Sequence, residues 1–229
     1  MSEVFKLYGV TVEDLNAYLL KSGVKYRLSS SVNGIKVTFD YSNLEESFVY
    51  SFLSNFTLKY QKNIYAESDE TLANQLIKIA KLRNIKIKTA ESFTGGSIAS
   101  ELTAISGASQ VFYEGIVAYS NQAKINRLNV SEKTIETYGA VSSQTASEMC
   151  SGLIDGSETL AISTTGIAGP SSDESGQPVG LCYIAVGSES KIKVFKHNFS
   201  GTREQITKQG KYAAIFHAVM ALRSSDFDI

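Results

Sequence analysis

Cysteine and histidine are both scarce in this sequence of 229 residues, which has two of each. Cys150 and Cys182 lie far apart and lack the close spacing of a zinc site or a redox motif. We therefore expect two small buried thiols in a reducing compartment, and no bound metal. His197 and His217 lie outside the polar loops described below, so a Ser-His-Asp site has poor candidates.

Long apolar runs are also missing. No stretch reaches the roughly 18 consecutive apolar residues of a membrane helix, and the opening MSEVFKLYGV lacks the basic-then-apolar layout of a secretory signal. The 22 Lys and Arg balance 23 Asp and Glu, and the formal net charge is -1. This balance gives no global electrostatic reason to bind nucleic acid or a membrane. We expect a cytoplasmic protein with neither as a partner.

Residues 1–66 are expected to form a small α+β module. A strand and a helix open it, and Asn33-Gly34 between two alternating runs then predicts a hairpin. Apolar residues at near-helical spacing predict a helix over 44–56, and alternation predicts a strand over 58–66. Two interpretations stay open at this point: a binding or dimerising module, and a packing spacer.

Residues 67–229 alternate strand and helix patterns, which indicates a three-layer α/β/α domain. The last two strands follow each other directly, so they are expected to pair antiparallel within a mixed sheet. The predicted strands are 85–90, 111–120, 159–165, 179–187 and 191–199, and the main helices are 71–84, 143–154 and 202–222.

Polar residues and glycines follow the first of these strands, in TAESFTGGSIAS. Glu91, Ser92 and Thr94 lie at the strand end, where ligands collect in open α/β sheets. Gly95 and Gly96 would let a backbone approach a ligand, and the next helix would offer its N-terminal amides to a phosphate or an oxyanion. A helix cap with glycines for tight packing is an equally good interpretation of this stretch alone.

Two further loops have the same character. The first, AYSNQAKIN, places Lys124 about one turn into a predicted helix. The second, STTGIAGPSSDESGQPVG, contains Gly166, Gly169 and both prolines of the chain, Pro170 and Pro178. Three polar loops at strand ends argue for a site, although no single loop is specific.

A serine can be activated by a lysine when burial lowers the lysine pKa enough for the amine to accept a proton. Ser92 and Lys124 are the available pair, and Tyr119 is placed to orient or relay the proton. Composition alone favours plainer interpretations, namely a solvated helix lysine and a strand tyrosine with its hydroxyl at the surface.

Several separated motifs resemble the C-terminal domain of the CinA family, the nicotinamide mononucleotide amidase domain. They are AESFTGG, SGASQVFYEGIVAYSNQAK, YGAVS, TTGIAGP and PVGLCYIAV, in the family's order from about Ser68 onward. The amino-terminal module, with LYGV and NIYAESDETLANQL, is similar to the small KH-like segment that precedes this domain. The larger molybdopterin-binding-like domain of the family is not seen in this sequence.

The resemblance implies cofactor-free hydrolysis of the carboxamide of nicotinamide mononucleotide, with a nucleotide as the small-molecule partner. It implies Ser92 as nucleophile, Lys124 as base and Tyr119 as the residue that orients them. Backbone amides of residues 94–96 or 166–169 would hold the oxyanion, and Arg203 in FSGTREQI would bind the phosphate or form a helix-start salt bridge. The resemblance also suggests a homo-oligomer, with a dimer as the commonest closed form. The other substrate-binding candidates are Glu91, Thr94, Gly95, Gly96, Asn121, Thr165, Gly166, Ala168 and Gly169.

Four positions depart from the family pattern. Phe93 stands where cysteine is usual, Gln122 where glutamate is usual, Thr202 where aspartate is usual, and Thr207 where a second arginine is common. The proposed serine, tyrosine and lysine are all kept. The departures predict that the part of the site that binds the phosphate is weaker or suits a different ligand. Two alternatives stay open: a nucleotide-binding module without turnover, and an interaction protein associated with competence or DNA repair.

Overall fold

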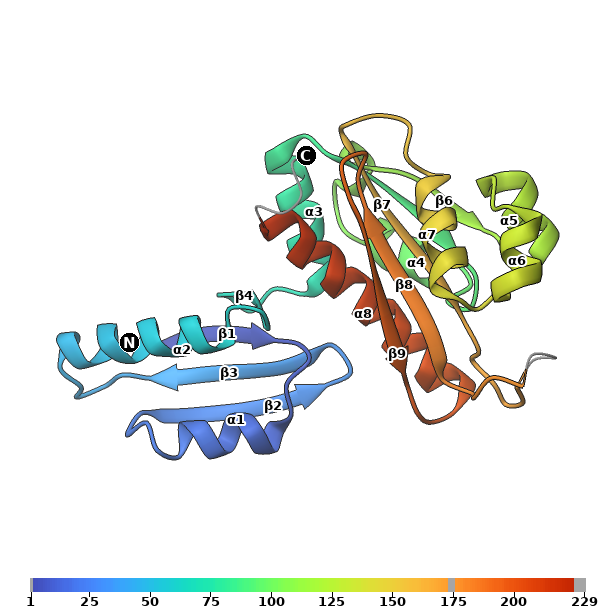
Figure 1. The fold of residues 1–229 in the computed structure, drawn as a ribbon. Helices are drawn as coiled ribbons and strands as arrows, with labels where there is room; N and C mark the ends of the chain where they lie inside the picture. The colour runs from blue at the N-terminus through green and yellow to red at the C-terminus, as the bar shows by residue number, and fades with distance from the viewer. Residues whose placement is uncertain (1, 173–175, 225–229) are drawn as a thin grey trace. The chain divides into compact units, whose positions relative to one another are not determined.

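The structure is a computed structural model that describes residues 2–172 and 176–224. Contacts between Cα atoms divide the chain into two compact units, Met1–Gln75 and Leu76–Ile229 (Figure 1). The boundary that the sequence suggests, between residues 66 and 67, stays a prediction. Each unit is described by itself.

The first unit is built on a four-stranded antiparallel sheet with strand order β2-β3-β1-β4. Ser31 of β2 pairs with Gly34 of β3, which confirms the hairpin predicted at Asn33-Gly34. Gly34 has a φ of 109°, a left-handed conformation that favours glycine. The elements are β1 (Ser2–Leu7), α1 (Val12–Leu19), β2 (Lys25–Ser31), β3 (Gly34–Asp40), α2 (Glu46–Tyr60) and β4 (Ile64–Ala66).

Aromatic side chains form much of the core of this unit. Phe39 of β3 meets Phe52 and Phe56 of α2 edge to face, with both centroid distances at 5.0 Å. The predicted strand over 58–66 is wrong in its first half, because α2 continues to Tyr60 and β4 begins only at Ile64. The four-residue spacing of Phe52, Phe56 and Tyr60 buries all three on one helical face, and this burial outweighs the local alternation.

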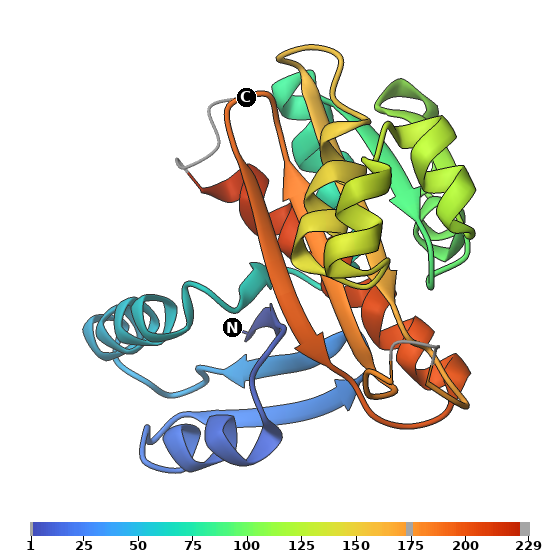
Figure 2. The same ribbon diagram turned by 45° about the vertical axis from the view of Figure 1, so that its right-hand side comes forward.

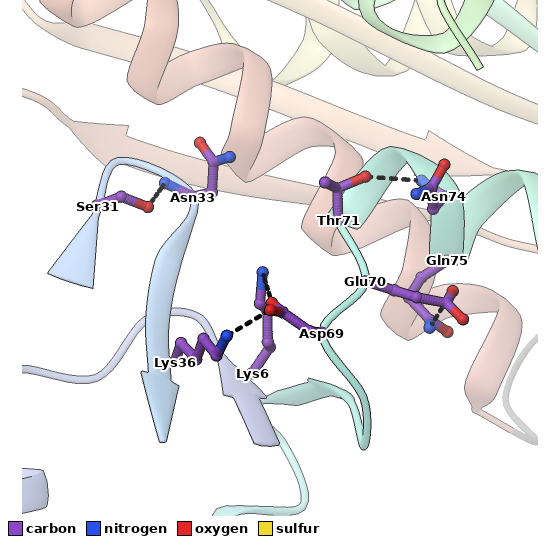
Figure 3. A network of polar contacts seen from close by, with 9 residues as sticks. All are labelled: Lys6, Ser31, Asn33, Lys36, Asp69, Glu70, Thr71, Asn74 and Gln75. Atoms are coloured by element: carbon purple, nitrogen blue, oxygen red, sulfur yellow. Dashed lines mark hydrogen bonds and ion pairs between the residues drawn. The ribbon is translucent and has the colours of Figure 1, made fainter. Parts of the chain in front are cut away.

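Asp69 ties the segment after β4 back to the sheet of the first unit (Figure 3). Its carboxylate lies 3.0 Å from Nζ of Lys6 on β1 and accepts a hydrogen bond from Lys36 on β3. The hydrogen bond from Lys36, followed by that from Lys6, holds the pKa of Asp69 below its usual value. Thr71 then caps α3 by accepting from the amide of Asn74 at 3.1 Å.

The second unit contains a five-stranded mixed sheet with strand order β6-β5-β7-β8-β9. Strands β6, β5 and β7 are parallel, whereas β8 and β9 run antiparallel to their neighbours, as predicted. The carboxyl ends of three neighbouring strands therefore meet at one edge of the sheet. The strands are β5 (Lys86–Glu91), β6 (Phe112–Val117), β7 (Thr159–Gly166), β8 (Leu181–Gly187) and β9 (Ile192–Asn198).

Helices cover both faces of this sheet, which confirms the three-layer α/β/α prediction. Helix α7 packs against β7, β8 and β9, whereas α8 crosses the opposite face over β7 and β8 (Figures 1 and 2). No helix in the described ranges combines the length and hydropathy of a membrane span. The helices are α3 (Leu72–Arg83), α4 (Ser97–Thr103), the 3-10 turn η1 (Ala108–Gln110), α5 (Asn121–Leu128), α6 (Glu132–Tyr138), α7 (Ser143–Ser151) and α8 (Arg203–Arg223).

Both cysteines lie inside the second unit as free thiols, as expected. Cys150 lies on the buried face of α7 with Ala146 and Met149, and Cys182 packs on the other face of the sheet with Ile206. Burial raises the pKa of the Cys182 thiol to about 12 and raises that of Cys150 as well. Neither thiol is therefore suited to act as a nucleophile.

Candidate active site

Ser92 lies in the turn between β5 and α4, at the carboxyl edge of the sheet. Its amide donates to the carbonyl of Thr164 on β7 at 3.0 Å, and its carbonyl accepts from the amide of Gly95 at 3.0 Å. Only 8% of Ser92 is exposed. These bonds fix the backbone on both sides of the hydroxyl, so the side chain has one well-defined direction.

Lys124 approaches Ser92 from the next strand–helix connection. Ser120 begins α5 as its N-cap, since its Oγ accepts from the amide of Ala123 at 3.1 Å, and this places Lys124 in the first turn. The lysine Nζ lies 3.1 Å from Oγ of Ser92 and 3.1 Å from the carbonyl oxygen of Ala118. The helix thus presents an amine directly to the serine hydroxyl.

Burial changes the acid–base chemistry of this lysine. Lys124 is 2% exposed, and no carboxylate among the described residues pairs with it. Desolvation lowers the pKa of Lys124 to about 8. About a tenth of the amine is therefore neutral at pH 7 and about half at pH 8, and a neutral amine can accept the proton of Ser92.

The pair opens into a cavity of about 330 Å³, a size that falls at the lower end of small-molecule sites. Ser92 and Lys124 lie among loops that follow β5, β6 and β7 and the start of α8. The lining comprises Ser92, Phe93, Tyr119, Asn121, Lys124, Ala140, Val141, Thr165, Gly166, Ile167, Ala168, Gly169, Ser171, Ser172 and Arg203.

Arg203, the first residue of α8, joins two of these loops. Its Nη1 donates to the carbonyl of Gly169 at 2.6 Å, and its Nη2 donates to the hydroxyl of Tyr119. Among the described residues no carboxylate pairs with Arg203, so the alternative prediction of a helix-start salt bridge finds no partner there. Tyr119 is 58% exposed, and its hydroxyl meets Arg203 rather than Ser92 or Lys124. A role for Tyr119 in orienting the serine and lysine stays a prediction.

Glu91, which is predicted to bind substrate, is not among the residues that line the cavity. Its buried carboxylate accepts hydrogen bonds from the amides of Gly96 and Ile98, both at 3.0 Å, and Ala99 at 2.8 Å. A carboxylate at this position satisfies the free amides at the start of α4 and favours its dipole. The helix terminus is therefore closed to a ligand.

Gly95 and Gly96 also lie away from the cavity lining, and both have positive φ, at 61° and 90°. They turn the chain into α4, so their conformational freedom serves the turn. The hydroxyl of Thr94 is 2.7 Å from that of Thr164, which joins the turn to β7. Of the predicted oxyanion donors 94–96, the amides of Gly95 and Gly96 are thus already bonded.

The remaining predicted residues come from the end of β7 and the loop after it, and from Asn121 at the start of α5. Gly166, Ala168 and Gly169 line the cavity, and so does Thr165, whose hydroxyl donates to the carbonyl of Ala140 at 2.6 Å. This bond draws the loop before α7 into the site. Sequence reasoning missed Ala140 and Val141, although the YGAVS stretch that contains them was noted, and it missed Ser171 and Ser172.

The chain matches the family described as CinA C-terminal domain over residues 69–222. It belongs to the CinA family. A CinA-like protein of Fusobacterium nucleatum is 42% identical over 161 residues, which cover 69% of this chain and 39% of that protein. A CinA-like protein of Endomicrobium trichonymphae is 37% identical over 191 residues, which cover 81% of this chain and 45% of that protein.

Solved structures agree with this assignment. The competence/damage inducible protein CihA from Agrobacterium tumefaciens superposes with a TM-score of 0.62 at 34% identity, covering 67% of this chain and 94% of that one. The competence damage-inducible protein A from Klebsiella pneumoniae gives 0.64 at 29% identity, covering 67% and 96%. The chain spans about two fifths of the length of the curated CinA relatives named above.

Two of the departures from the family pattern have plain structural roles here. Thr202 forms a capping box with Gln205 at the start of α8, which does the work of an aspartate cap. Gln122 donates to Asn126 at 2.9 Å on the exposed side of α5. Neither position carries the contact between Ser92 and Lys124.

Proposed function

We propose that this CinA protein hydrolyses the carboxamide of nicotinamide mononucleotide to nicotinic acid mononucleotide and ammonia. The observation that carries the proposal is the buried contact between Lys124 Nζ and Ser92 Oγ, which opens into a cavity that Arg203 also lines. The proposed substrate has a carboxamide at one end and a phosphate at the other. We also propose a homodimer, which the contacts within one chain leave open.

In the first half of the reaction, neutral Lys124 accepts the proton of Ser92 as Oγ attacks the amide carbon. The amides of Ala168 and Gly169 line the cavity and make no hydrogen bond among the described residues, so we assign them to the developing oxyanion. The ammonium of Lys124 then returns the proton to the amide nitrogen, and ammonia leaves as the C–N bond breaks. An ester joins the acyl group to Oγ.

In the second half, a water molecule replaces ammonia. Lys124 accepts a proton from the water as its oxygen attacks the ester carbon, and then gives that proton to Oγ as the ester bond breaks. Ser92 and Lys124 return to their starting state, and the carboxylic acid is released. The two half-reactions therefore need one nucleophile and one base, both of which are side chains of this chain.

The guanidinium of Arg203 is the best phosphate ligand among the residues that line the cavity. Its planar fork binds phosphate oxygens in a bidentate way, and its present partners are a carbonyl and a hydroxyl, which are weaker acceptors. A phosphate would replace Tyr119 and Gly169 as the acceptor. Thr207, where the family often has a second arginine, adds no charge here, so Arg203 is the only arginine among the described residues that line the cavity.

The test is ammonia release from purified protein with nicotinamide mononucleotide, run beside Ser92→Ala and with a chelator present. We expect turnover in the unmodified protein that is unaffected by chelator and lost in the variant. A folded protein that is stabilised by the nucleotide yet releases no ammonia would contradict the proposal and indicate a binding module.

A further inference from the structure

Phe93 follows Ser92 directly, and its ring is anchored on the side of the sheet that α8 covers. The ring is 5% exposed and packs in a cluster with Ala168, Cys182 and Ile206. Its backbone carbonyl also lies 3.5 Å from Oγ1 of Thr207, a weak contact at the limit of hydrogen bonding. The residue after the proposed nucleophile is therefore held by its side chain.

Gly210 makes room for this ring. It is a buried glycine in the interior of α8, where alanine would favour the helix. A Cβ built on Gly210 would lie 2.4 Å from Cζ and 2.5 Å from Cε2 of Phe93, far inside van der Waals contact. The missing side chain thus forms a notch in α8 that the ring fills.

The ring is packed among other buried side chains. Ile206 lies one turn earlier on α8, and Ala168 and Cys182 belong to the same buried cluster, with Val179 and Phe199 packed against it. Rotating the ring out of the notch would open a void in a close-packed region, and pushing it back would move the backbone of the turn that carries Ser92. The position of the ring and the position of Ser92 are therefore coupled.

We propose that Phe93 and Gly210 are a positioning pair for the nucleophile: the ring seated in the notch of α8 holds Oγ of Ser92 within reach of Lys124. The inference rests on the proposed function, because it concerns the same serine. Phe93 acts through Ser92 and needs no contact with substrate for this role. A shift of about 1 Å at a nucleophile is enough to slow a reaction by up to about a hundredfold.

The experiment compares Gly210→Ala, Phe93→Leu and the double variant. We measure melting temperature and the rate at which phenylmethylsulfonyl fluoride sulfonylates Oγ of Ser92 with loss of fluoride, followed by mass spectrometry. Neither readout needs the natural substrate. Gly156→Ala is the matched control, because a Cβ on Gly156 meets nothing within 4 Å.

We expect Gly210→Ala to lower the melting temperature by about 5 °C and the labelling rate by about tenfold. In the Phe93→Leu background the ring that clashes is gone, so Gly210→Ala acts only through the higher helix propensity of alanine. It should then raise the melting temperature by about 3 °C and should no longer slow labelling. If Gly210→Ala does not fold, a double variant that does fold shows the same compensation of Gly210→Ala by Phe93→Leu.

The outcomes separate the two proposals. A Gly210→Ala protein that is more stable than the unmodified one and is labelled at the same rate overturns the positioning pair alone. Labelling of Ser92 without ammonia release from nicotinamide mononucleotide overturns the substrate assignment alone. An unmodified protein that is neither labelled at Ser92 nor able to release ammonia from nicotinamide mononucleotide has no activated serine, and this overturns both.

Discussion

Nζ of Lys124 lies 3.1 Å from Oγ of Ser92, although the two residues follow different strands of the sheet. Strands β5 and β6 are parallel neighbours, so their carboxyl ends bring the two turns together. A base on one turn and a nucleophile on the other can work only as a unit.

Removing either partner should therefore abolish hydrolysis to the same extent. We expect Ser92→Ala and Lys124→Met each to lower kcat by at least about a thousandfold, and the double variant to be no worse than the poorer single variant. Initial rates of ammonia release measure this. Additive losses in the double variant would show that the two side chains act separately.

The pKa of Lys124 sets the pH dependence. Because burial lowers this pKa to about 8 and the neutral amine is the active form, kcat/KM should fall about tenfold for each pH unit below that value and level off above it. A pH profile from 6 to 9.5 in constant ionic strength tests the slope. A flat profile over that range would rule out Lys124 as the base.

Arg203 should govern recognition of the phosphate. We expect Arg203→Ala to raise KM for nicotinamide mononucleotide by about 10- to 100-fold, because a charged hydrogen-bonding partner is lost, with kcat changed by less than about threefold. KM for nicotinamide riboside, which lacks the phosphate, should not change. Lys208→Ala is the control, since Lys208 is an exposed cation of the same helix outside the cavity lining. Equal effects on both substrates would contradict phosphate binding.

Glu91 should matter for stability rather than for substrate binding. In Glu91→Gln one acceptor oxygen becomes an NH2 group that faces the amides of α4, so the free energy of unfolding should fall by about 2 kcal/mol. Urea unfolding measures this change, with the exposed Glu136→Gln as control. KM of the folded variant should stay unchanged. A large rise in KM would show that Glu91 contributes to substrate binding.

The two histidines should make the second unit sensitive to acid. Nε2 of His197 on β9 lies 2.9 Å from Nε2 of His217 on α8, with the ring of Phe195 stacked on His217 at 3.7 Å. Burial, and then the charge of His197, lowers the pKa of His217 to about 3, and burial lowers that of His197. Protonation is therefore easier in the unfolded chain.

The stabilisation from this pair is complete above the unfolded histidine pKa of about 6.5 and is lost as the pH falls below it. Each of these partly buried histidines contributes at most about 1.4 kcal/mol per pH unit in that range. We expect His217→Gln, which keeps a hydrogen-bonding side chain, to halve the decline in the free energy of unfolding between pH 6.5 and 5. An unchanged slope in urea titrations would contradict this.

Local patterns predicted most of the elements because each of those elements satisfies its own periodicity. The hairpin at Asn33-Gly34 and the turn from β5 into α4 are of this kind. The strand expected over 58–66 is wrong in its first half because two periodicities compete there. The residues alternate as in a strand, but a helix places Phe56 and Tyr60 on one face and buries both.

Partners distant in the sequence explain what was missed in the site. The sequence places Glu91 beside Ser92, but it does not indicate that the carboxylate of Glu91 accepts hydrogen bonds from the amides of α4. The hydrogen bond between Arg203 and Tyr119 joins segments that no local pattern connects. Residue types could be predicted from the sequence, whereas the direction of each side chain is set by tertiary packing.

The notch at Gly210 also constrains how this protein can change over time. With alanine at 210, the methyl group would overlap a phenylalanine ring at 93, so that combination costs stability. Among routes of single substitutions to the present pair, the less costly one passes through glycine first, and the less costly way back loses the ring first. The two distant positions are thus epistatic, and steric contact favours one order of their mutations.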